Sequence, residues 1–213
     1  GGGGDHRAGG VSHDGDHASD SLQEGVELWF SDEVEFHLLP HITRMWMPKG
    51  RQFRVPSPGK NQKIPVFGAV QYGTGLFVYH IQDKKNSWGF LALLTKLYER
   101  ARRRGTKILL VADNASIHEA SCVERFLSQP EVREHLSVYL LPTYCPDLNL
   151  IERLWGHVKR TGFANELFPS RTAFRAHVIR TMQQLRHKPS SVLGVVQKNQ
   201  MTCSGAMATM GIV

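Results

Sequence analysis

The sequence predicts an α/β domain built on a mixed β-sheet. Strand-like segments come first along the chain, and later strands alternate with helical segments, an order that favours a single mixed sheet covered by helices. The continuous apolar run Lys107–Ala112 is typical of a strand that is covered on both faces. The short turn Gly73-Thr74-Gly75 separates two further strand-like segments and indicates a hairpin.

Taken in order, the first strand begins at Val26 and runs into Asp32. The next two strands, 64–72 and 76–82, complete a three-stranded meander with it. The last two strands are expected over 107–112 and 136–141.

The apolar spacing from Trp88 to Tyr98 fits a helical period, and Asn86 or Ser87 can cap this helix at its start. The same helix should end in a run of arginines followed by Gly105. Further helices are predicted over 120–127, 147–160 and 171–186.

The two ends of the chain differ from the middle. Residues 1–24 are rich in Gly, Ser, Asp and His and nearly devoid of large apolar side chains, which predicts a disordered low-complexity leader. Residues 25–188 are long enough for one domain with a sizeable core. Residues 189–213 are expected to form a C-terminal tail, and the chain has no initiator Met, which suggests a fragment or a processed form.

Composition narrows the range of partners and compartments. Lys and Arg number 26 against 19 Asp and Glu, a net charge of +7 that favours polyanions such as nucleic acid as partners. The three cysteines form no metal-binding or disulfide pattern, so we expect reduced thiols, no zinc site and a cytoplasmic location. No apolar run reaches membrane length, so no membrane association is expected.

Three acidic residues carry the chemical prediction. Asp32 and Asp113 lie where apolar strands are expected to end, and Glu152 lies just inside a helix. Mg²⁺ prefers oxygen ligands, and two ions roughly 3.5–4 Å apart can activate a nucleophile and stabilise the leaving oxygen of a phosphodiester. We expect Asp32 to bridge two ions, with Asp113 holding one and Glu152 the other. The pattern therefore predicts a metal-dependent nuclease or strand transferase that acts on DNA.

Each acid also has a simpler interpretation. Asp32 beside Glu33 could be a solvated strand end, and Asp113-Asn114 could be an ordinary turn. Asn149 and Glu152 have the spacing of a capping box, which needs no metal ion. Only the joint pattern favours the metal site.

Five motifs, in the same order, resemble the catalytic domain of mariner-superfamily transposases, specifically the bacterial insertion-sequence branch. They are Trp29-Phe-Ser-Asp32-Glu33, Trp46-Met-Pro-Lys-Gly50, Phe67-Gly-Ala, Val111-Ala-Asp113-Asn114-Ala-Ser-Ile-His118 and Leu141-Pro-Thr-Tyr-Cys-Pro-Asp147-Leu-Asn-Leu-Ile-Glu152-Arg-Leu-Trp155. The resemblance implies a ribonuclease-H-like five-stranded sheet, with a three-strand antiparallel meander plus two parallel strands, flanked by helices. It also implies a D-D-E triad at Asp32, Asp113 and Glu152.

The resemblance further implies Mg²⁺ or Mn²⁺ as the cofactor, with two ions. The expected activity is hydrolysis at the ends of a transposon, followed by attack of the freed 3′-hydroxyl on target DNA, typically at TA. The expected partner is DNA, bound by a homodimer that associates with the nucleoid. The family's amino-terminal helix-turn-helix region has no counterpart here, which suggests a truncated copy. An inactive DNA-binding remnant and a ribonuclease-H-like nuclease are the alternatives.

The chain departs from the family at Leu150, where Pro is usual, and at Cys145, where Ser is usual; neither residue is a metal ligand. Supporting roles are expected for four residues near the acids: Asn114, His118, Asp147 and Asn149. For His118 and Asp147, a structural role is the alternative. DNA contacts are expected from four basic residues: Lys49, Arg51, Lys159 and Arg160. A solvated basic face is the alternative for Lys159 and Arg160.

Overall fold

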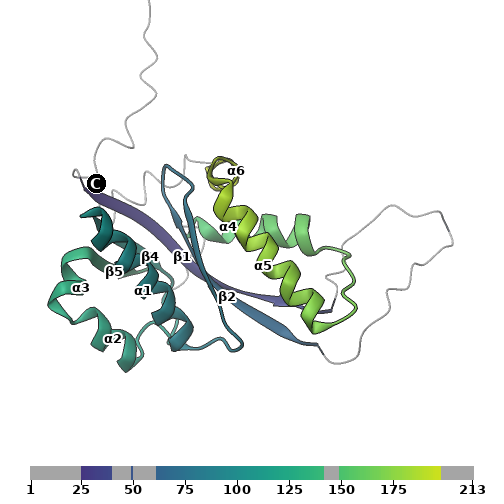
Figure 1. Cartoon of the computed structure of the whole chain (residues 1–213), viewed down its shortest axis with the longest axis horizontal. Coiled ribbons are helices and arrows are strands. Elements are labelled where there is room, and N and C mark those ends of the chain that lie inside the picture. The colour runs from purple at the N-terminus through teal and green to yellow at the C-terminus, as the bar shows by residue number, and fades with distance from the viewer. Residues whose placement is uncertain (1–24, 40–48, 50–60, 142–148, 198–213) are drawn as a thin grey trace, which may run out of the picture.

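The computed structural model describes residues 25–39, 49, 61–141 and 149–197 (Figure 1). In this part of the chain, five strands form one sheet in the order β3-β2-β1-β4-β5. β1 pairs antiparallel with β2 and parallel with β4, so the predicted mixed sheet is confirmed. The strands are β1 (Val26–His37), β2 (Lys63–Gln71), β3 (Phe77–Ile81), β4 (Lys107–Ala112) and β5 (Leu136–Leu140).

Helices cover both faces of this sheet (Figure 1). One face carries α1 (Ser87–Arg104), α2 (Ser121–Leu127) and α3 (Pro130–His135). The other face carries α4 (Ile151–Val158), a π-helical turn over Lys159–Phe163, α5 (Arg171–His187) and α6 (Pro189–Val196).

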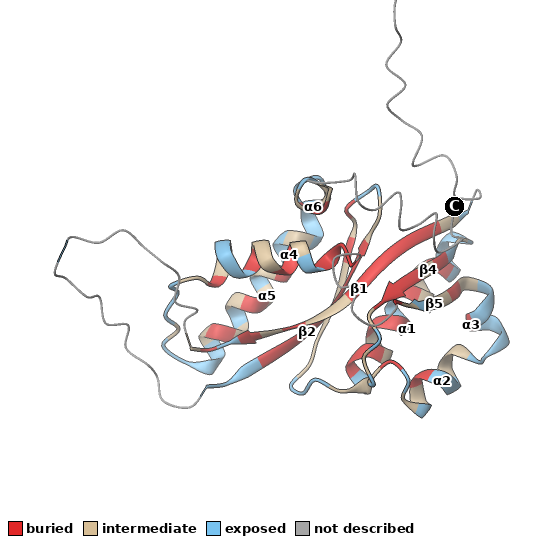
Figure 2. Ribbon diagram, turned by 180° about the vertical axis from the view of Figure 1, so that it is seen from behind, coloured by how far each residue is buried: buried red, intermediate tan, exposed pale blue. Residues whose placement is uncertain are grey.

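Side-chain alternation along β1 supplies a hydrophobic core on each face. Leu28, Phe30 and Val34 pack toward α4 and α5, whereas Trp29 packs toward α1. The buried residues therefore lie along both sides of the sheet (Figure 2). Because both faces are covered, successive side chains along β1 enter two different hydrophobic layers.

The ends of α1 are those that the sequence predicts. The Asn86 side chain accepts a hydrogen bond from the Gly89 N–H at 3.3 Å. Gly105 closes the helix with a φ of 64°, a conformation that glycine adopts without strain. The arginines Arg102–Arg104 occupy the last turn, where cations favour the helix dipole.

Two predicted boundaries differ from the structure. The expectation that the first strand ends at Asp32 is wrong, because β1 continues to His37. Pairing with β2 supports this extension, since the antiparallel ladder continues through Phe36 and His37. The predicted helix over 147–160 is described only from Ile151 as α4, because residues 142–148 lie outside the described part.

The ends of the packed chain can also be compared with the prediction. Residues 189–196, expected in the tail, form α6, and its Val192 and Val196 are buried in the core beside α4. The packed structure therefore continues past residue 188. The predicted leader, 1–24, and the segment 198–213 lie outside the described residues. Among the described helices, none is long and apolar enough to cross a membrane.

Candidate metal centre

Asp32 and Asp113 lie side by side at the point where β1 and β4 stop pairing. The last pair in this parallel ladder is Phe30 with Val111, and each acid follows two residues later. Alternation along β1 directs Asp32 to the same face as Phe30 and Val34, toward α4. The parallel register thus brings together two acids that are far apart in the sequence.

The third acid, Glu152, enters from the first turn of α4. The start of this helix is held to β1 by Asn149, whose side-chain Nδ2 donates to the Ser31 carbonyl at 2.8 Å. The Asn149 side chain is therefore used for β1, and α4, whose N-cap is Leu150, has no side-chain cap hydrogen bond at that residue. The helix is also held by Trp155, which packs over Gly68, the residue paired with Asp32 on β2.

Asp32 lies within electrostatic reach of both other acids. Burial raises the pKa of Asp32 to about 7, and the negative charges of Glu33, Asp113 and Glu152 add to this increase, against a backbone hydrogen bond that lowers it. Burial also raises the pKa of Asp113. The negative charge of Glu33 raises this pKa further, whereas the charge of His118 lowers it. The fold therefore places Asp113 and Glu152 within electrostatic reach of Asp32. Among the described residues, the group whose ligand atoms all lie within 4.8 Å of one another is instead Glu33, Asp113 and His118.

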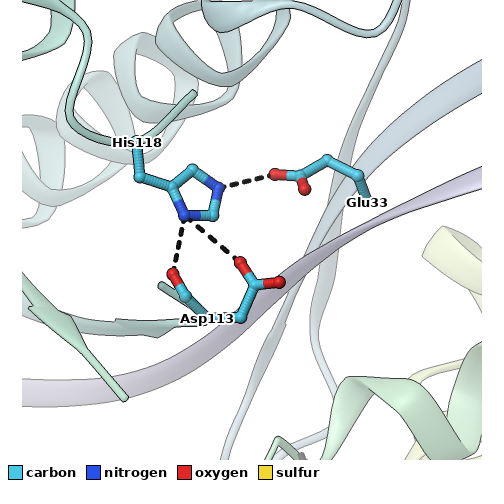
Figure 3. A group of neighbouring side chains, drawn as sticks. All are labelled: Glu33, Asp113 and His118. Carbon is cyan, nitrogen blue, oxygen red and sulfur yellow. Dashed lines mark hydrogen bonds and ion pairs between the residues drawn. The ribbon is translucent and has the colours of Figure 1, made fainter. Parts of the chain in front are cut away.

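A second group of side chains borders this site on the α1 side of the sheet (Figure 3). The His118 Nδ1 atom lies 2.7 Å from the Asp113 main-chain oxygen and 3.2 Å from its carboxylate. The other ring nitrogen of His118 lies 2.8 Å from Glu33. Burial lowers the pKa of His118, but hydrogen bonds and charges from Glu33 and Asp113 outweigh it, so the net pKa is raised.

Comparison with known proteins assigns the family. Residues 27–175 match the family described as DDE superfamily endonuclease. The chain belongs to this family. A curated relative, the insertion element IS630 uncharacterized 39 kDa protein of Shigella sonnei, is 37% identical to this DDE endonuclease chain over 139 residues. That match covers 65% of the chain and 39% of the relative, so the chain spans well under two thirds of that protein.

Solved structures show the same fold for the DDE endonuclease domain. The Mos1 transposase paired-end complex with left transposon end matches with a TM-score of 0.55 and 15% identity, covering 84% of this chain and 57% of that chain. The Mos1 strand transfer complex matches with a TM-score of 0.52 and 16% identity, covering 85% and 57%. These likenesses confirm the ribonuclease-H-like fold class.

The donor atoms of this DDE endonuclease domain suit a hard divalent cation. All three acids offer carboxylate oxygens. The pKa of Asp32 is raised first by burial and then by neighbouring negative charges, which a nearby cation would offset. The family implies the use of a divalent metal. Magnesium and manganese both accept an all-oxygen donor set.

The other predicted site residues have separate places in the domain. Asn114 and Lys49 are exposed, and Asp147 and Arg51 lie outside the described residues. Lys159 lines a groove of about 340 Å³ beside Phe36 and Phe163. Arg160 lines a different groove, of about 490 Å³, which it shares with Glu152.

Sequence reasoning missed residues on both sides of the site. Glu33 was treated as the neighbour of Asp32, although strand alternation could have placed it on the opposite face, toward His118. The Lys85 Nζ atom lies 3.5 Å from Glu33. The sequence did not indicate this contact, because Lys85 lies in the loop before α1, where no helix or strand pattern predicts its position. Arg153 and His157 also line the groove beside Glu152. They lie one and five positions after Glu152, which is not the i+3 or i+4 spacing of helical neighbours, so the sequence did not indicate them.

Proposed function

We propose that this chain is the catalytic domain of a DNA transposase that cleaves phosphodiesters at transposon ends and joins the freed 3′-hydroxyl to target DNA. Membership of the DDE superfamily endonuclease family supports this proposal. The observation that carries it is that Asp32 on β1 lies within electrostatic reach of both Asp113, just past β4, and Glu152, at the start of α4. The Mos1 structures with transposon ends support DNA as the partner.

The proposed roles follow from the position of each acid. Asp32 is the most buried of the three, and the charges of the other two acids both act on it, so it would suit a ligand shared by two ions. Asp113 would hold one ion and Glu152 the other. When bound, Mg²⁺ or Mn²⁺ lowers the pKa of a water molecule and stabilises charge on the leaving oxygen.

We propose that DNA approaches along the groove between α4 and α6. Arg160, His157 and Arg153 line this groove together with Glu152, so basic side chains lie beside one of the proposed metal ligands. Phosphate contacts of this kind position the DNA backbone without reading its sequence. Lys49, Arg51 and Lys159 are further proposed contacts to DNA. The chain is also proposed to act as a homodimer on DNA. Its proposed location is cytoplasmic, and it associates with the nucleoid when bound to DNA.

The test is cleavage of supercoiled DNA in Mg²⁺ or Mn²⁺ by the wild-type chain, Asp113→Asn and Glu152→Gln. Removing one charge-stabilising group from an active site commonly lowers the rate about 100-fold or more, so both variants should lose nicking to at least that extent. Glu131→Gln, an exposed acid on α3, is the matched control and should cleave like the wild type.

DNA binding, followed by fluorescence anisotropy, separates the alternatives. A wild-type chain that binds DNA but never nicks it would support an inactive remnant. Preferential cleavage of an RNA–DNA hybrid would support a ribonuclease-H-like nuclease. Equal nicking by Asp113→Asn and the wild type would reject the assignment of the acids.

A further inference from the structure

Backbone pairing between β1 and β4 ends before it reaches the proposed metal ligands. The ladder stops at Phe30 with Val111, and Asp32 and Asp113 lie beyond it. No described backbone hydrogen bond of this ladder reaches the two acids. The Ser31 hydroxyl donates to the Val111 carbonyl at 3.4 Å, but this bond also reaches β4 two residues before Asp113. A divalent ion shared between two strands needs the distance between the two acids to be held by something else.

His118 spans this gap from the α1 side. Its Nε2 contacts the Glu33 carboxylate on β1 at 2.8 Å, and its Nδ1 contacts the Asp113 main-chain oxygen, just past β4, at 2.7 Å (Figure 3). The His118 side chain is 1% exposed and that of Glu33 is 2% exposed, whereas that of Asp113 is 47% exposed. The link is thus buried, and the acid that it holds faces solvent.

Neighbouring groups fix the orientation of this link. The Phe90 ring lies against the His118 imidazole with centroids 4.1 Å apart. Lys85 lies 3.5 Å from the second Glu33 oxygen and offsets part of its charge. With the imidazole packed and both its nitrogens engaged, the ring has little freedom to turn.

The same three side chains could be read as a metal site of their own, since their ligand atoms lie within 4.8 Å of one another. The hydrogen-bond geometry argues against that reading. A main-chain carbonyl only accepts, so the Nδ1 atom that faces Asp113 carries a hydrogen and cannot coordinate an ion. The remaining nitrogen is directed at Glu33.

We infer that His118 and Glu33 are positioning residues that hold Asp113 at a fixed distance from Asp32 and so preorganise the metal centre. This inference rests on the proposed function. Strand alternation provides the arrangement, because Asp32 faces α4 while its neighbour Glu33 faces His118 on the opposite side. The single strand β1 thereby supplies one metal ligand and one anchor for the other ligand.

The test is Mn²⁺ affinity, measured by electron paramagnetic resonance on the folded chain. Loss of a residue that orients a metal ligand typically weakens metal binding 10–100-fold, so His118→Gln and Glu33→Gln should raise the Mn²⁺ Kd by that factor. The number of ions bound should stay unchanged, and nicking should recover in excess Mn²⁺. His135→Gln is the matched control, because His135 also bonds a main-chain oxygen, that of Thr106 at 3.1 Å, far along the sheet from the site.

The outcomes separate this inference from the proposed function. One outcome would overturn the positioning role alone. In it, Asp113→Asn loses Mn²⁺ binding, whereas His118→Gln and Glu33→Gln keep the wild-type affinity for Mn²⁺. A Glu33→Gln variant that binds fewer ions would also overturn it, in favour of a separate metal site. A wild-type chain that binds no Mn²⁺ would contradict the proposed function and the positioning role with it. If His118→Gln fails to fold, the conservative Glu33→Gln decides.

Discussion

The Asn149 side chain donates a hydrogen bond to the Ser31 main-chain oxygen at 2.8 Å, joining the start of α4 to the middle of β1. Ser31 immediately precedes Asp32, and Glu152 lies one turn after Asn149. One buried hydrogen bond thus links the segments that carry two of the proposed metal ligands. The residue that sequence spacing suggested as a helix cap serves instead as a tie between a helix and a strand.

Asn149→Asp should therefore destabilise the domain. The substitution keeps the size of the side chain but replaces its donor with an acceptor, so the buried Ser31 oxygen loses its partner. Leaving a buried polar group unsatisfied costs about 1–3 kcal/mol, and this decrease in the free energy of unfolding should appear in urea denaturation. Asn114→Asp, at an exposed residue beside the site, is the control. An equal decrease in the free energy of unfolding in both variants would contradict a stabilising role for the Asn149–Ser31 hydrogen bond.

Gly68→Ala should displace Trp155 and with it α4. A Cβ at this position would lie 2.5 Å and 2.7 Å from two atoms of the Trp155 ring, closer than packed atoms allow. Such overpacking costs about 1–3 kcal/mol of unfolding free energy and should also weaken Mn²⁺ binding, because Glu152 lies on α4. Gly194→Ala adds the same methyl group within α6, where nothing lies within 4 Å, and should be neutral or stabilising by up to about 1 kcal/mol. Wild-type stability in Gly68→Ala would refute the close contact.

The raised pKa of Asp32 predicts how stability depends on pH without metal. The folded state holds the Asp32 proton up to about pH 7, whereas the unfolded chain releases it near 3.8, so the free energy of unfolding should fall as the pH rises between these values. Asp32→Asn removes this cost and should be more stable than the wild type at pH 8 in EDTA, by about 2–4 kcal/mol. The two proteins should converge near pH 4 in urea denaturation. If the two proteins differ in free energy of unfolding by the same amount at every pH, the electrostatic cause is contradicted. At pH 8, Mg²⁺ should reduce the difference in stability between Asp32→Asn and the wild type.

Arg160→Gln should weaken DNA binding in a manner that depends on salt. If Arg160 contacts one phosphate, its loss should reduce the slope of log affinity against log salt by about one, measured by fluorescence anisotropy with duplex DNA. Arg133→Gln, an exposed cation on α3 across the sheet, removes the same charge and should change the slope less. Identical slopes for both variants would attribute DNA binding to overall charge and not to the groove between α4 and α6.

Local patterns predicted most of the framework. The apolar run of β4, the hairpin at Gly73-Thr74-Gly75 and the Asn86 cap of α1 all depend on residues near one another in the chain, and all agree with the structure. The end of β1 was misplaced, because Asp32 and Glu33 are polar and interrupt the apolar pattern. Pairing with β2, which lies far along the chain, carries the strand through them.

The sequence by itself determined the order of the strands and of the longer helices, the basic charge and the choice of three acids as proposed ligands, because these depend on composition, short-range periodicity and motif spacing. The short helices α3 and α6 were not predicted. The tertiary structure alone decided which face each acid occupies and which groups hold it. Asp32 and Glu33 are adjacent, yet strand alternation sends one toward Glu152 and the other toward His118. The physical reason is that parallel register and helix packing join residues separated by 80 or more positions, as in the Ser31–Val111 and Glu33–His118 contacts.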